Sequence, residues 1–120
     1  MPIMYANNLR RLLVQIVMKS LQEIKQQLQA GEFEFTRHAL KRAIERNISD
    51  REIREIAENI QIIEDYPNDK YSPSCLLLGV TQIDRALHFQ VSRMESDKTK
   101  IITLYEPDLN EWLDYKIRRK

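Results

Sequence analysis

The sequence predicts an α+β fold in which three helices precede an antiparallel four-stranded sheet and a C-terminal helix follows it. Up to residue 60 the apolar residues recur at helical spacing, whereas between residues 61 and 105 they follow the period of β-strands. The expected strands are joined by short turns, which require antiparallel neighbours because a parallel return needs a long crossover. Helices grouped before the strands are typical of the α+β class.

The first predicted helix occupies most of residues 1–31 and ends at Ala30-Gly31, because glycine adopts the left-handed C-terminal cap without a steric cost. Its apolar arc covers about half of the helix circumference, which is wider than a surface helix requires. We therefore divide the chain into an N-terminal helical extension at residues 1–31 and an α+β domain at residues 32–120, packed as one compact unit.

Two further helices are predicted before the sheet. One runs from about Arg37 to Arg46 with Thr36 as its N-cap. The other begins at Ser49-Asp50-Arg51-Glu52, an S-x-x-E capping box in which the serine and the glutamate each bond a backbone N–H of the first turn. On a helical wheel the buried face of the second helix comprises Ala39, Leu40, Ala43 and Ile44.

The apolar pattern predicts four strands, at residues Gln61–Tyr66, Ser74–Thr81, Ala86–Met94 and Lys100–Tyr105. Glu106-Pro107-Asp108 then predicts the start of the last helix, because proline suits the first helical position. We expect Trp112 to anchor this helix on the sheet.

Composition excludes several classes of site. The glycines Gly31 and Gly79 lie too far apart for a glycine-rich dinucleotide or phosphate loop. The single cysteine, Cys75, allows no intrachain disulfide and no cysteine-rich zinc site, and two histidines are too few for a three-histidine zinc centre. We expect no metal and no other cofactor. The formal net charge of +1 gives no argument from overall basicity for a nucleic-acid partner.

No apolar run approaches the ~18 residues that a membrane-spanning helix needs, so we expect no membrane partner. A lone thiol and the lack of a signal-peptide pattern favour the reducing cytoplasm, where we expect the protein to be located.

The second predicted helix carries a stripe of His38, Arg42 and Arg46 along one border of its apolar face. Arginine offers a fixed fork of N–H donors for phosphate, and histidine titrates near neutral pH, so this stripe can bind an anion. The alternative is that both arginines pair with nearby carboxylates such as Glu45 and that His38 only packs.

His88 lies in the middle of the third predicted strand, on the face opposite Leu87, Phe89 and Val91. A histidine on the polar face of a sheet can line a cleft or can simply bond to a neighbouring element. Tyr105 ends the fourth predicted strand, where a tyrosine can donate a proton or can serve only in packing.

These residues carry a resemblance to a known family. Phe35-Thr36-Arg37-His38-Ala39, followed by Arg42, Arg46 and Ile48-Ser49, resembles the opening of the bacterial domain-of-unknown-function family 4258. The resemblance covers about residues 33–117 and leaves the first predicted helix outside it. The segments that continue it are Ile62–Tyr66, Cys75–Gly79, Leu87–Val91, Ile101–Pro107 and Trp112.

The resemblance implies a distant similarity to the RelE/ParE and BrnT toxins of bacterial toxin–antitoxin pairs, several of which cleave RNA without a metal. In such a reaction a base removes the proton of a 2′-hydroxyl, which then attacks the adjacent phosphate. His88 or His38 would supply the base, the other histidine or Tyr105 the acid, and Arg42 and Arg46 would hold the phosphate. This hypothesis requires the His38 stripe and the polar face around His88 to meet at one cleft.

The alternative is a non-catalytic protein-interaction module in which the same histidines and arginines hold the structure together. If the whole apolar arc of the first helix packs on the sheet, the helix is a structural extension. If a stripe of it remains exposed, an antitoxin or a second copy of the chain would cover it. RNA is a possible partner only under the nuclease hypothesis.

Overall fold

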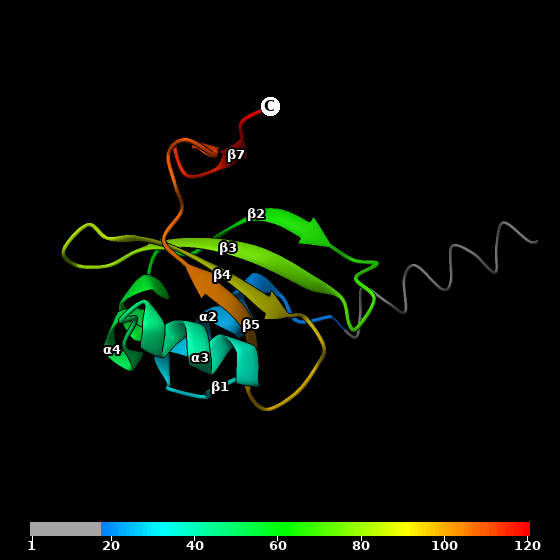
Figure 1. The fold of residues 1–120 in the computed structure, drawn as a ribbon. Helices are drawn as coiled ribbons and strands as arrows, with labels where there is room; N and C mark the ends of the chain where they lie inside the picture. Colours follow the sequence, from blue (N-terminus) through cyan, green and yellow to red (C-terminus); the bar gives the residue numbers. More distant parts are fainter. Residues whose placement is uncertain (1–17) are drawn as a thin grey trace, which may run out of the picture.

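The computed structural model describes residues 18–120 (Figure 1). Residues 1–17, which contain the beginning of the first predicted helix, lie outside the described residues. In chain order the elements are α2 (Leu21–Gln29), β1 (Phe33–Phe35), α3 (Arg37–Glu45), α4 (Asp50–Ile56), β2 (Gln61–Tyr66), β3 (Ser74–Val80), β4 (Ala86–Ser92), β5 (Thr99–Tyr105), β6 (Trp112–Leu113) and β7 (Ile117–Arg118).

The main sheet has five strands in the order β1-β5-β4-β3-β2. Strands β2 to β5 pair antiparallel, as predicted. The prediction of four strands is wrong, because β1 adds a fifth strand that runs parallel to β5. Strand β1 spans only three residues, which is too short for a strand period to be visible in the sequence.

Side-chain caps begin α3 and α4 where the sequence predicts them. Thr36 Oγ1 accepts a hydrogen bond from the backbone N–H of Ala39 at 3.1 Å, and Ser49 and Glu52 form a complete capping box. Helix α2 ends before Gly31, which has a φ of 76° and continues the chain in the left-handed conformation that glycine favours. The predicted starts of α3 and α4 and the predicted end of the first helix are therefore confirmed. The prediction that the first helix runs through residues 18–20 is wrong, because Met18 forms a β-bridge with Met94 and Ser20 caps the start of α2 at Leu21.

The helices lie on one side of the main sheet (Figure 1), and we call this side the helix face. It carries the hydrophobic core, in which Ile24 and Leu28 of α2 join Ile53 of α4 and Leu77 and Phe89 of the sheet. Helix α2 therefore shares its core with the sheet, and the domain boundary at residue 31 stays a prediction.

Part of the predicted buried face of α3 is wrong. Ala39 and Ala43 are buried, but 49% of Leu40 and 72% of Ile44 are exposed. Helix α3 packs against β5 and β1 near the edge of the sheet, where its two alanines fill the contact. The longer side chains next to them are left at the surface.

The predicted C-terminal helix is also wrong, because this segment forms a small hairpin of β6 and β7. Asp114 and Tyr115 have φ values of 52° and 63°, the left-handed pair that the centre of a type I′ turn requires. The backbone N–H of Lys116 closes this turn by donating to the carbonyl of Leu113 at 3.0 Å. Pro107 is compatible with the start of a helix, which is why the sequence predicted one. The position of a proline does not predict the left-handed conformation of Asp114 and Tyr115 that forms the hairpin instead.

The C-terminal hairpin lies on the other side of the sheet from the helices (Figure 1), and we call this side the hairpin face. Trp112 is buried, so the prediction that it anchors the C-terminal segment is confirmed although the segment is not helical. No helix within residues 18–120 is long and apolar enough to cross a membrane.

Candidate functional site

A pocket of about 550 Å³ lies where α3, the end of β5 and the segment before the hairpin meet, and we call it the β5-end pocket. Its walls are made by Arg46, Tyr105, Glu106 and Glu111. Arg46 and Tyr105 are two of the residues that the sequence singled out, and the fold brings them together from separate elements.

His88 lies directly behind Tyr105, because the two residues are partners across β4 and β5. The His88 side chain is fully buried. Its Nδ1 lies 3.2 Å from the hydroxyl of Tyr105, and its Nε2 lies 2.6 Å from the carbonyl oxygen of Tyr115. A carbonyl only accepts hydrogen bonds, so Nε2 carries the proton and Nδ1 accepts from the tyrosine hydroxyl.

Burial sets the protonation of this pair. It lowers the pKa of His88, and the Tyr115 carbonyl and the charge of Glu64 oppose that shift only in part. Burial also raises the pKa of Tyr105. Near neutral pH the site therefore holds a neutral imidazole and a protonated phenol.

The hairpin closes over His88 through aromatic and charged contacts. The ring of Trp112 meets the His88 ring edge-to-face at a centroid distance of 4.5 Å. The Arg118 guanidinium lies 4.6 Å from the centre of the tryptophan ring and bonds Glu64 of β2 at 2.9 Å. Burial alone would raise the pKa of Glu64, but hydrogen bonds from Arg118 and Tyr66 outweigh it and lower the pKa. The hairpin is thus tied to the edge strand β2.

Arg46 is held at the edge of β5. Strand β1 pairs with β5 only as far as Ile101, so the later backbone carbonyls on this edge need other donors. Thr36 Oγ1 donates to the carbonyl of Ile102 at 3.1 Å, and Arg46 Nη1 donates to the carbonyl of Leu104 at 2.7 Å. The guanidinium has five N–H donors, so it retains others that can face the pocket.

The structure does not bring the remaining two candidates into the β5-end pocket. Arg42 bonds Glu45 of its own helix at 2.7 Å, as the structural alternative predicted. His38 is exposed on α3, and eight residues of helix place it about 12 Å from Arg46 along the helix axis. His38 thus belongs to the helical layer, whereas His88 projects from the hairpin face, and the single cleft that both histidines would share does not form.

A family model described as Domain of unknown function (DUF4258) matches residues 35–106. The chain belongs to this family. The match leaves α2 and the C-terminal hairpin outside, so the carbonyl of Tyr115 that orients His88 is not part of the matched DUF4258 segment. No curated protein and no solved structure matches the chain. The matched segment contains all five candidates, His38, Arg42, Arg46, His88 and Tyr105.

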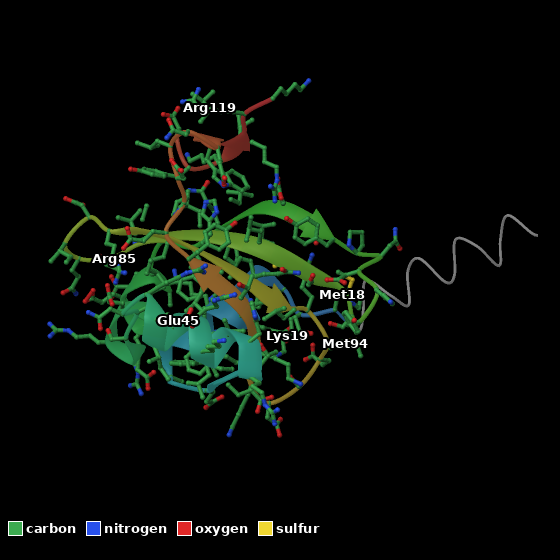
Figure 2. All side chains as sticks on the ribbon, in the orientation of Figure 1. Met18, Lys19, Glu45, Arg85, Met94 and Arg119 are labelled. Atoms are coloured by element: carbon green, nitrogen blue, oxygen red, sulfur yellow. The ribbon has the colours of Figure 1, made fainter. Side chains whose placement is uncertain are left out.

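Sequence reasoning missed Arg85, which joins three parts of the DUF4258 domain near the pocket. It bonds the Glu52 carboxylate at 2.7 Å and also pairs with Glu106, a residue of the pocket wall. It donates to the backbone carbonyl of Arg46 at 2.8 Å. Arg85 lies in the loop between β3 and β4 (Figure 2), and a single arginine in a loop carries no periodic signal that predicts such a role.

Two further kinds of site can be checked among the described residues, a reactive thiol and a metal cluster. Cys75 is buried, and burial raises its pKa to about 12, so the thiol is inert at neutral pH. Residues 18–120 contain no cluster of three or more histidine, cysteine, aspartate or glutamate side chains that could hold a metal ion.

Proposed function

We propose that this DUF4258 domain cleaves RNA at the β5-end pocket without a metal, as a toxin-like endoribonuclease. The observation that carries the proposal is the chain of hydrogen bonds from the Tyr115 carbonyl through His88 to Tyr105, with Arg46 in the same pocket. A hydroxyl that already donates to a neutral imidazole is oriented to accept a further proton. The sequence resemblance to RelE/ParE and BrnT toxins supports the same reaction class.

In the proposed reaction a ribose 2′-hydroxyl donates its proton to Tyr105 while Tyr105 passes its own proton to Nδ1 of His88. The 2′-oxygen forms a bond to the adjacent phosphorus, and the bond from phosphorus to the 5′-oxygen breaks. The leaving oxygen takes a proton from water, and the resulting hydroxide recovers the proton of His88 through Tyr105. The products are a 2′,3′-cyclic phosphate and a 5′-hydroxyl end.

Burial and the positive charge of Arg118 lower the pKa of His88, and two neighbours reduce the cost of its transient positive charge. The Tyr115 carbonyl and the nearby carboxylate of Glu64 both favour the charged imidazole. In this proposal Tyr105 is the catalytic residue because it touches the substrate, and His88 is a positioning residue that acts through it.

Arg46 would hold the phosphate and stabilise the charge that develops on it. Glu106 and Glu111 share the pocket wall, and Arg85 pairs with the carboxylate of Glu106. Arg42 and His38 remain candidates for contacts to RNA outside this pocket, along the flank of α3.

The experiment compares two tyrosine variants in a cleavage assay on single-stranded RNA of mixed sequence, with a chelator present. Tyr105→Phe removes only the hydroxyl that bonds His88, and it should slow cleavage by about 10²–10⁴-fold. Tyr66→Phe is the matched control, because its hydroxyl does not contact His88 and Arg118 still pairs with Glu64, and it should cleave like wild type. Intact RNA with the wild-type protein, or equal rates for wild type and Tyr105→Phe, would overturn the proposal.

We also propose that the domain acts as the toxin of a toxin–antitoxin pair. Bacteria that express the wild-type chain should stop growing and lose intact RNA, whereas cells that express Tyr105→Phe should grow normally. The expected partner is an antitoxin, or a second copy of the chain, bound through the N-terminal helix.

The second candidate function is the non-catalytic interaction module. The exposed Leu40 and Ile44 on α3 favour it, because they are adjacent on one helix face next to a shallow groove lined by Phe35 and Ile48. Light scattering coupled to size-exclusion chromatography tests self-association through this face. A dimer that Ile44→Asp dissociates, together with the absence of RNA cleavage, would favour the module over the nuclease.

A further inference from the structure

A second pocket, of about 400 Å³, lies at the other end of β5, and we call it the loop pocket. It lies near Met94, at the end of the sheet remote from Arg85 (Figure 2). Its walls come from β1, from β5, from the end of β4 and from the loop between β2 and β3. The lining includes Glu34, Asp69, Tyr71, Ser92, Lys100 and Ile102.

Hydrogen bonds fix the β2–β3 loop to the hairpin face of the sheet. Asp69 Oδ2 accepts from Ser74 Oγ at 2.8 Å and from Gln90 Nε2 at 3.2 Å. The hydroxyls of Ser72 and Ser92 are 3.1 Å apart. The wall that this loop contributes is therefore held in place before any ligand arrives, which lowers the entropic cost of binding.

The pocket offers an aromatic surface beside hydrogen-bond acceptors. Tyr71 is 89% exposed and Met94 is 50% exposed, so both present apolar surface to solvent at the pocket. Exposed aromatic side chains stack on nucleic-acid bases. The Glu34 carboxylate accepts hydrogen bonds and cannot donate them, which favours a flat ligand that carries donors along one edge. Asp69 already accepts hydrogen bonds that hold the loop.

Among the RNA bases, guanine fits this chemistry best. Its Watson–Crick edge carries two neighbouring N–H donors that match the two oxygens of one carboxylate, whereas adenine and cytosine place an acceptor next to their amino group. Proteins read unpaired RNA bases in this way, by stacking and by hydrogen bonds to that edge. Lys100 is the register partner of Glu34 across β1 and β5, and it supplies a cation for a nearby phosphate.

We infer that the loop pocket binds the guanine base of a single-stranded RNA whose phosphate occupies the β5-end pocket. This inference rests on the proposed function, because it names the nucleotide recognised next to the cleavage site. Ile102 in the loop pocket and Tyr105 in the β5-end pocket are separated by three residues of one strand, which corresponds to about 10 Å. An extended single strand of RNA covers this separation, and cleavage therefore falls next to guanosine.

The test measures binding of nucleoside monophosphates to the full chain by calorimetry and by backbone amide NMR. GMP should bind at least about tenfold more tightly than UMP, with shifts at Tyr71 and Lys100. Glu34→Gln and Tyr71→Ala should each weaken the binding of GMP by about tenfold. Both side chains are exposed and lie outside the loop's hydrogen bonds, so neither change should affect folding. Glu32→Gln, an exposed neighbour that does not line the pocket, is the matched control and should bind like wild type.

The outcomes separate the two proposals. RNA cleavage without guanine preference, together with no GMP binding, overturns the loop-pocket inference and leaves the nuclease intact. GMP binding that Tyr71→Ala weakens, with no cleavage of any RNA, supports the pocket and overturns the nuclease. Protection of these residues by a protein partner, with no response to GMP or UMP, also overturns the inference.

Discussion

The two faces of the sheet are built from different side chains and are held by different forces. On the helix face, Leu77, Leu87 and Phe89 are fully buried under the helices. On the hairpin face, His88 is also fully buried, but its neighbours are hydrogen-bonding groups such as the Tyr105 hydroxyl and the Tyr115 carbonyl. One strand, β4, contributes alternately to both faces.

Because of this difference, we expect the helix face to determine stability and the hairpin face to determine the protonation of His88. Apolar packing depends on buried area and shape and has no preferred direction, so the helix face provides most of the folding free energy. A buried imidazole with a bond at each nitrogen has one tautomer and one orientation. The hairpin face therefore holds a titratable group with a defined proton position, and the two faces should respond differently to substitution.

The largest effect should come from the helix face. Phe89→Ala removes a fully buried ring from the core and should lower the free energy of unfolding by about 3–5 kcal/mol. Leu113→Ala on the hairpin is the comparison, because Leu113 is 45% exposed, and it should cost less than about 1 kcal/mol. Urea unfolding measures both changes. Similar losses would mean that the helix face does not dominate stability.

An intermediate effect should come from the protonation of His88. Burial lowers its pKa from the ordinary value of 6.5, so the unfolded chain binds the proton more tightly than the folded one. The stabilising contribution of the neutral histidine is complete above about pH 6.5, and it is lost as the pH falls toward the folded-state pKa. The free energy of unfolding should therefore decrease between pH 7.5 and pH 5.5.

Two variants show whether His88 causes this pH dependence. His88→Gln should reduce the difference in unfolding free energy between pH 7.5 and pH 5.5, whereas His38→Gln, at an exposed position, should preserve it. Glu52 and Glu64 do not interfere, because their pKa values lie below the ordinary 4.5. An unchanged pH dependence in His88→Gln would contradict the buried neutral histidine.

The smallest effect should come from the ion pair that ties the hairpin to β2. Arg118→Ala removes the bond to Glu64 and the contact with the Trp112 ring. Because 61% of the Arg118 side chain is exposed, the loss should be about 1 kcal/mol or less and should shrink further in high salt. Thermal unfolding at low and high salt measures it, with Lys116→Ala as the control. A loss as large as that of Phe89→Ala would contradict this view of the hairpin.

The sequence predicts the elements that have a periodic residue pattern or a local capping residue. Alternation along β4 places His88 opposite Leu87 and Phe89, as observed, and the capping residues Thr36 and Ser49 mark the starts of α3 and α4. These features depend on residues close together in the chain, so local reasoning is sufficient for them.

Elements that are too short to show a periodic pattern, or that depend on contacts distant in the sequence, were not predicted. Strand β1 has three residues. The C-terminal hairpin depends on the left-handed Asp114 and Tyr115, a conformation that is uncommon for residues other than glycine and that the sequence does not mark. The partner of His88 is a backbone carbonyl 27 positions away, and backbone groups have no sequence signature. For the same reason the sequence could not predict which of the candidate residues share a pocket.

The tautomer of His88 tests the central claim most directly, because the proposed reaction needs Nδ1 free to accept from Tyr105. Nitrogen-15 NMR of the imidazole ring at pH 7.5 distinguishes the tautomers without any substrate. We expect a neutral ring protonated at Nε2, with Nδ1 shifting when Tyr105→Phe removes the hydroxyl. A ring protonated at Nδ1, or an imidazolium at pH 7.5, would contradict the proposed path of the proton.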